Sequence, residues 1–202
     1  MKNYGLLIAL LLLSIGLFGQ EPPAPVQEEA SPAPLVEIEA EFNFQPFPGG
    51  YLGVWEGELK IYAADGLKQS VPMELDISPI DDSTFTYTII YGEDREAGKR
   101  DYLLRKGKEG SNHWVIDEQD GILLDNFYVG GILHGPFIVM GSQLYSQLER
   151  RGMHLHYSIA SGSSKSFRES GTTTEVKGEE QRIDVEAFKI GSYQMAVLKR
   201  RE

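Results

Sequence analysis

From Leu52 onward, apolar and polar residues alternate with a period of two, the pattern of a β-strand that buries one face. Within 52–63, Trp55, Leu59 and Ile61 share one face of the predicted strand, and charged residues occupy the other. Aromatic and β-branched side chains, which favour pleated surfaces, recur throughout. The same alternation predicts further strands at 71–77, 84–91, 100–106, 112–117, 122–129, 132–140, 143–150, 153–160 and 193–200.

Short turn signals separate these segments, among them Ala64-Asp65-Gly66, Gln119-Asp120-Gly121 and Gly130-Gly131. About ten short strands joined by tight turns predict an all-β fold, and closing the meander removes its exposed edges. We therefore expect an antiparallel up-and-down β-barrel of about 8–10 strands. The pattern leaves 163–192 open between a mobile loop, a short strand pair and a single helical turn.

The first 20 residues have the layout of a secretory signal peptide. Lys2 precedes an apolar run from Leu6 to Phe18, which ends before Gly19-Gln20. A membrane-spanning helix needs about 20 apolar residues, and this run is shorter. We expect residues 1–20 to be a signal peptide that is cleaved after Gly19 or Gln20. The mature protein is then expected to have no transmembrane anchor and to be secreted or periplasmic.

Residues 21–41 are rich in Pro, Ala and Glu, a composition that favours an extended, solvated linker. A Pro-rich ligand for a recognition module is the alternative. Phe42, Phe44 and Phe47 follow, and we expect these aromatics to cover one end or face of the folded domain. The β-barrel domain is predicted to occupy 42–202.

Charge and cysteine content exclude several function classes. The chain has 202 residues and a formal net charge of −11, which argues against a nucleic-acid partner. It contains no cysteine, so disulfides, Cys-ligated metals and a thiol nucleophile are excluded. An exported domain without disulfides must take its stability from its hydrophobic core.

The string Gly53-Val54-Trp55-Glu56-Gly57 opens the strand series, and a basic strand ending in Lys199-Arg200-Arg201 closes it. This arrangement resembles the calycin group of lipocalins, fatty-acid-binding proteins and nitrobindin-like barrels. In lipocalins the Trp of the first strand closes one barrel end, and an Arg packs across its ring through a cation–π contact. The resemblance implies that Trp55 and Arg200, or Arg201, close the barrel here.

Other features depart from these families. The chain lacks the cysteines and the Thr-Asp-Tyr motif of lipocalins, and no His follows His156, so the haem-ligating His of nitrobindin-like proteins has no counterpart. The segments 91–100 and 117–121 are similar to exported bacterial proteins of comparable length, a likeness that implies no activity.

A polar set on otherwise apolar faces is the candidate ligand-binding site. Tyr87, Tyr91 and Tyr102 lie on faces that the alternation turns inward, and Arg100 precedes Tyr102 on the same strand. Calycin cavities are apolar with a few convergent polar groups, and a two-pronged guanidinium suits a carboxylate. The alternative is ordinary core packing, with the hydroxyls satisfied at the rim.

Metal and catalytic sites are weaker hypotheses. His154 and His156 share one strand face and could present two nitrogens to a metal, or could belong to a solvated face. The acids Asp117, Glu118, Asp120 and Asp125 flank a Gly turn but do not fit a calcium-loop spacing. The string 160–164 lacks the first Gly of a nucleophile elbow.

Three functions remain in competition. The first is an exported soluble barrel that binds a small hydrophobic or amphipathic ligand, without catalysis and without a cofactor. The second is a barrel with a packed core that acts as a protein-interaction or structural module of the cell envelope. The third is a hydrolase or isomerase built at the barrel mouth.

Overall fold

The computed structural model describes residues 47–177 and 179–202. The predicted signal peptide (1–20) and linker (21–41) lie outside the described residues, as do Phe42 and Phe44. In the described part of the chain, no helix is long and apolar enough to cross a membrane.

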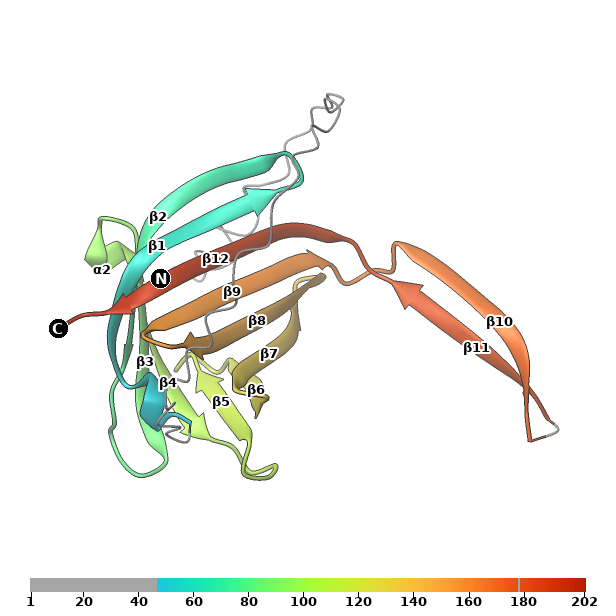
Figure 1. Ribbon diagram of the computed structural model, residues 1–202, viewed down its shortest axis with the longest axis horizontal. Helices are drawn as coiled ribbons and strands as arrows, with labels where there is room; N and C mark the ends of the chain where they lie inside the picture. Colours follow the sequence, from blue (N-terminus) through green and yellow to red (C-terminus); the bar gives the residue numbers. More distant parts are fainter. Residues whose placement is uncertain (1–46, 178) are drawn as a thin grey trace, which may run out of the picture. The chain divides into compact units, whose positions relative to one another are not determined.

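Ten strands form a closed barrel, and short turns join most of them (Figure 1). Their bounds are β1 (Gly53–Ala63), β2 (Gly66–Ile77), β3 (Thr84–Tyr91), β4 (Lys99–Lys106), β5 (His113–Asp117), β6 (Leu123–Val129), β7 (Ile132–Val139), β8 (Ser142–Arg151), β9 (His154–Ser163) and β12 (Ile190–Arg200). Each of the strands predicted from the alternation is present, most within one or two residues of its predicted bounds. Three strands extend further: β2 begins five residues before 71, β9 ends three residues after 160, and β12 begins three residues before 193.

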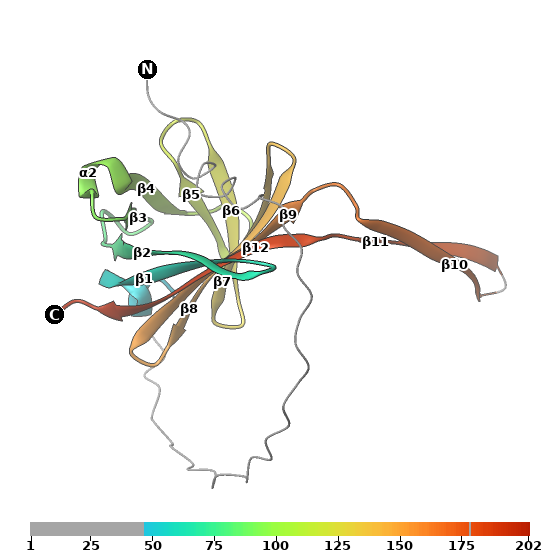
Figure 2. The same cartoon turned by 90° about the horizontal axis from the view of Figure 1, so that it is seen from above.

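The barrel is an antiparallel meander, which confirms the predicted fold class. Consecutive strands pair from β1 through to β9, and β12 then closes the barrel by pairing with β9 on one side and β1 on the other. The seam between β1 and β12 runs in register from Trp55↔Arg200 to Ala63↔Ser192. Figure 2 shows the same elements from above.

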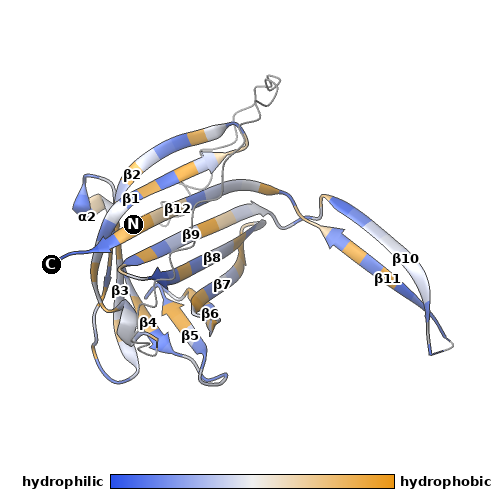
Figure 3. Cartoon of the chain, in the orientation of Figure 1, coloured by the Kyte–Doolittle hydropathy of each residue, from blue (hydrophilic) through white to orange (hydrophobic). Residues whose placement is uncertain are grey.

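Side chains alternate between the barrel interior and its outer face, as the sequence pattern predicted. On β1, Trp55, Leu59 and Ile61 are buried, and on β9 Leu155 and Tyr157 are buried. Polar and apolar bands accordingly alternate along the barrel strands in Figure 3. Burial of this interior surface, at roughly 25 cal/mol per Å² of apolar area, drives the folding of a chain that has no cysteine.

The segment left open by the sequence forms a strand pair. Strands β10 (Arg168–Val176) and β11 (Glu179–Ala187) pair with each other as a separate two-stranded sheet between β9 and β12. The described residues of β11 are all exposed. This hairpin therefore has no hydrophobic core of its own, which explains why its strands show no clear apolar alternation.

One barrel end is filled by aromatic rings, and we call it the aromatic end (Phe47, Tyr51, Trp55, Trp114 and Tyr128). The short 3₁₀ helix η1 (Gly49–Tyr51) leads into β1. The ring of Phe47 lies 4.9 Å from Tyr51, 5.0 Å from Trp114 and 4.7 Å from Tyr128, measured between centroids. Of the three aromatics expected to cover one end, Phe47 does so.

Candidate functional site

Four tyrosines project into the barrel interior from three strands. Tyr87 and Tyr91 lie on β3, and Tyr87 pairs in register with Tyr102 on β4. The hydroxyl oxygen of Tyr91 lies 3.4 Å from that of Tyr157 on β9. Since three strands separate β9 from β3 on that side of the barrel, this contact spans the interior rather than following the wall.

The hydroxyls of Tyr87 and Tyr102 have no hydrogen-bond partner among the described residues. The two residues are only 3% and 9% exposed, yet among the described residues neither hydroxyl forms a hydrogen bond. No side-chain nitrogen or oxygen in this part of the chain is both sealed from solvent and unpaired.

Arg100 lies beside these tyrosines, at the start of β4, where it pairs with Ile89. Its Nη1 donates to the carbonyl oxygens of Ala97 (3.1 Å) and Lys99 (2.6 Å). Ala97 belongs to the short helix α2 (Arg95–Gly98). A guanidinium has five N–H donors, and the Nε and Nη2 hydrogens bond to none of the described residues. One nitrogen of the guanidinium is thus fixed in place, while the edge formed by Nε and Nη2 has no partner in the described part of the chain.

Glu118 follows β5 and supplies an acidic group next to Arg100. Burial raises the pKa of the Glu118 carboxyl, and nearby Asp120 adds to the rise, whereas Arg100 acts in the opposite direction. The charge of Glu118 also contributes to the raised pKa of Tyr102, after burial. Arg100 and Glu118 therefore share one electrostatic environment with the Tyr102 hydroxyl.

The tyrosine hydroxyls are neutral donors. Burial is the main cause that raises the pKa of Tyr87, Tyr91, Tyr102 and Tyr157 above the ordinary value for tyrosine. None of the four ionises near neutral pH, so each can donate a hydrogen bond to a ligand oxygen.

Small polar side chains line the same end of the barrel. The hydroxyls of Ser161 on β9 and Ser192 on β12 lie 2.6 Å apart, and both residues are buried. Gln194, also buried, follows on β12. We call this region the polar end and define it by Tyr91, Arg100, Glu118, Ser161 and Ser192.

The structure brings together all four residues that the sequence singled out for ligand binding: Tyr87, Tyr91, Arg100 and Tyr102. Sequence reasoning missed Tyr157 and Glu118. Both carried a usable signal, because Tyr157 alternates with Leu155 and Ile159, and Glu118 continues the inward positions of Trp114 and Ile116.

Trp55 and Arg200 are paired in register on β1 and β12. Trp55 is 2% exposed, and its indole nitrogen donates to the carbonyl oxygen of Tyr51 at 2.9 Å. Gly53 has φ +117°, and a Cβ there would lie 2.8 Å from Nε of Arg200. The Arg200 side chain therefore crosses the start of β1, where only glycine leaves room for it. The closing role of the pair stays a prediction.

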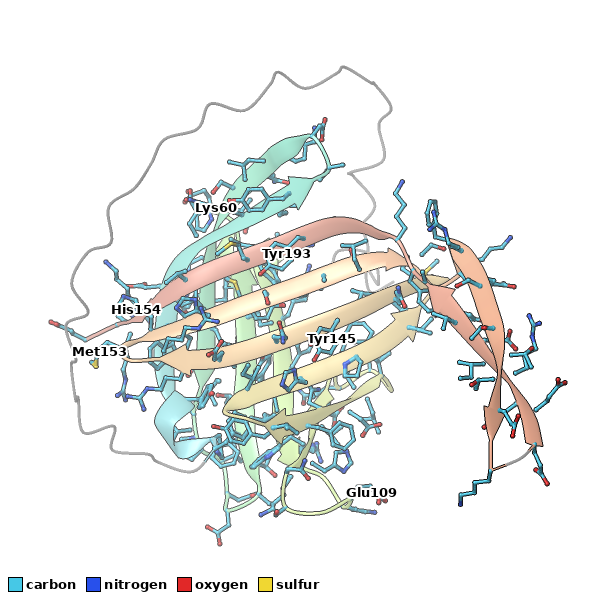
Figure 4. The ribbon with its side chains drawn as sticks, turned by 45° about the vertical axis from the view of Figure 1, so that its right-hand side comes forward. Lys60, Glu109, Tyr145, Met153, His154 and Tyr193 are labelled. Atoms are coloured by element: carbon cyan, nitrogen blue, oxygen red, sulfur yellow. The ribbon has the colours of Figure 1, made fainter. Side chains whose placement is uncertain are left out.

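His154 and His156 share the outer face of β9, where Figure 4 labels His154. They pair across the strand boundary with Arg151 and Glu149 of β8. Burial lowers the pKa of His156, and the charge of Arg151 lowers it further. The described residues contain no group of three or more His, Asp or Glu placed to hold a metal.

The acids near the 119–121 turn have separate partners. The Asp117 carboxylate forms an ion pair with Nε of Arg105 at 3.1 Å. Asp125 lies 2.8 Å from Nε2 of His113, whose Nδ1 accepts from the backbone N–H of Glu109. His113 therefore carries its proton on Nε2 and donates it to Asp125. These acids form ordinary hairpin contacts.

The fold and the site define a closed, ten-stranded up-and-down barrel with polar groups in its interior. No family model and no curated protein matches the sequence. Among solved structures, the S-type phycobiliprotein lyase CPES from Guillardia theta is similar, with a TM-score of 0.50 and 7% sequence identity. The match covers 75% of this chain and 88% of that chain. At this identity the likeness concerns the fold.

Proposed function

We propose that the protein is an exported calycin-type barrel that binds a small amphipathic ligand inside the barrel, without catalysing a reaction. The observation that carries this proposal is that the Tyr87 and Tyr102 hydroxyls, in the barrel interior, bond to none of the described residues. Buried polar groups are normally paired, so these two hydroxyls support a partner such as a bound ligand.

The lining favours a ligand with an apolar body and an acidic oxygen head. Ile89, Leu104 and Ile159 supply apolar wall, whereas the hydroxyls and Arg100 supply donors. The parallel N–H groups of the free guanidinium edge suit a carboxylate. The similar barrel is a phycobiliprotein lyase, and bilins are amphipathic molecules with carboxylates. Biliverdin is therefore a suitable probe beside a simple fatty acid such as oleate.

Native mass spectrometry tests the proposal directly. The protein is purified from its own host, and its mass is compared before and after denaturation. A reproducible extra mass that is lost on denaturation supports an interior ligand. A bare protein mass, together with no binding of biliverdin or oleate by the same sample, overturns the proposal in favour of the packed interaction module.

Site variants then localise the binding. We expect Tyr87→Phe and Tyr102→Phe each to weaken probe binding about 2- to 10-fold, the worth of one hydrogen bond. Arg100→Gln should weaken it about 10- to 100-fold, because a charged donor is lost. The matched control is Tyr193→Phe, since Tyr193 is 42% exposed on the outer face (Figure 4). An equal loss in the control would place the probe outside the barrel.

Export requires a separate test. The apolar run at 6–18 and the Pro-rich stretch that follows support cleavage near residue 20. Intact-mass measurement of the protein from cell envelope and culture fractions should show a chain that starts at about residue 20 or 21. An intact Met1 in cytoplasmic extract alone would contradict the export part of the proposal and leave the binding part standing.

A further inference from the structure

The β10–β11 hairpin has two long open edges. Within the described chain, β10 and β11 pair only with each other, over nine register positions from Arg168↔Ala187 to the turn. An isolated two-stranded hairpin is marginally stable in water, and an unpaired edge is a template for another strand. The hairpin therefore lacks the partner that a two-stranded sheet needs.

The two edges differ in charge. Strand β11 carries four acidic residues against one basic residue, Arg182. Strand β10 with the following Lys177 is balanced, with two acidic and two basic residues around the uncharged run 170–174. Figure 3 shows β10 as pale to blue, without apolar bands. Two β11 edges would repel each other, whereas two β10 edges would not.

We propose that β10 pairs antiparallel with β10 of a second copy of this chain, which joins the two hairpins into one four-stranded sheet. Residues directly opposite each other in an antiparallel pair point to the same face of the sheet. The two-fold axis between identical strands must therefore pass between one residue and the same residue of the second copy. The charges along β10 decide which residue this is.

The favoured axis passes through Thr173. Thr172 then lies opposite Thr174 of the second copy, and Glu169 lies beside Lys177 of the second copy, the turn residue that follows β10 with φ +55°. Moving the axis to Thr172 would instead place Glu169 opposite Glu175 of the second copy. Opposite charges and Thr pairs stabilise cross-strand contacts, and like charges destabilise them, so the Thr173 axis is preferred.

Gly171 would lie opposite Glu175 of the second copy in this register. A Cβ at Gly171 would lie 2.5 Å from the Asp184 carboxylate and 3.3 Å from Nη2 of Arg182, and Nε of Arg182 donates to that carboxylate at 2.8 Å. A recess of about 320 Å³ lies there, and three acids, Glu169, Asp184 and Glu186, line it together with Arg182. Gly171 therefore adds no attraction to this register, which depends on Glu169 and the threonines.

The same charges predict a closed dimer rather than a fibre. Once the β10 edges are paired, the outer edges of the four-stranded sheet are the two acidic β11 strands. Further strand addition between copies would bring these like charges together, so association stops at two chains.

Cross-linking in this cysteine-free chain tests the register. Opposed residues of an antiparallel pair have Cα atoms about 4.5–5.5 Å apart, within disulfide range. Under mild oxidation of the full chain, Thr173→Cys should therefore give a covalent dimer. The control Ser170→Cys is also exposed, but its two copies lie about six residues apart along the strands and should stay monomeric.

Sedimentation velocity from about 1 µM to 1 mM measures the association itself. Lys177→Glu should raise the dissociation constant about tenfold, and Glu169→Lys combined with Lys177→Glu should restore it, because the pair is only exchanged. A monomer at every concentration, equal cross-linking of both cysteine variants, or a dimer unaffected by Lys177→Glu would each overturn the proposal.

Discussion

The two ends of the barrel use tyrosine in opposite ways. At the aromatic end, the Tyr51 hydroxyl donates to the carbonyl oxygen of Gly131 at 2.7 Å and accepts from the backbone N–H of Arg150 at 3.1 Å. Towards the polar end, the hydroxyls of Tyr87 and Tyr102 bond to none of the described residues, and Tyr91 has a single long contact with Tyr157. The aromatic end is tied to the backbone by its tyrosine, whereas the tyrosines towards the polar end make few hydrogen bonds to the described residues.

The largest expected effect tests the aromatic end. Trp55→Ala removes a side chain that is 2% exposed and its hydrogen bond to Tyr51. We expect the free energy of unfolding to fall by about 3–5 kcal/mol, the usual cost of a large cavity. Urea unfolding followed by circular dichroism measures it, with Tyr193→Ala on the outer face as the control. A loss no larger than that of the control would show that this end does not stabilise the barrel.

A smaller effect compares the ends with one kind of substitution. Tyr51→Phe removes two hydrogen bonds to backbone groups and should cost about 1–3 kcal/mol. Tyr91→Phe removes one contact of 3.4 Å between hydroxyls and should cost less than about 0.5 kcal/mol. The measurement is the midpoint of urea unfolding for both variants. Equal losses of stability would mean that the tyrosine hydroxyls of the two ends stabilise the barrel equally, which contradicts the proposed difference between the ends.

The barrel strands could be predicted because each has one buried face, and burial imposes a period of two. The segment 163–192 could not be assigned, because β10 and β11 pack against no core and Thr172, Thr173 and Thr174 carry no inward or outward signal. Backbone pairing alone holds this hairpin, and backbone pairing leaves little trace in side-chain pattern.

The candidate site could be predicted only in part, and for a different reason. Alternation placed Tyr87, Tyr91 and Tyr102 inward one strand at a time. The contact of Tyr91 with Tyr157 spans the interior and depends on strand tilt and stagger, which single-strand patterns do not contain.

The smallest expected effect concerns Glu118 at the polar end. Burial raises the pKa of this carboxyl in the folded protein, so the folded state holds the proton more tightly than the unfolded state does. Its contribution to stability is therefore fully present below the ordinary pKa of 4.5 and is lost as the pH rises through the raised value. Glu118→Gln should remove this loss.

At pH 7 the free energy of unfolding of Glu118→Gln should accordingly exceed that of the parent by about 0.5 kcal/mol, the scale of a partly screened charge interaction. The variant should therefore unfold at a higher urea concentration. Near pH 3 the two proteins should be equally stable. Glu74 titrates with the opposite sign: burial would raise its pKa, but Arg95 and Arg201 together lower it. Because both proteins contain Glu74, its effect cancels in their difference. If the difference in stability is the same at both pH values, ionisation of Glu118 does not destabilise the barrel. The contrast between the two ends would then rest on hydrogen bonding alone.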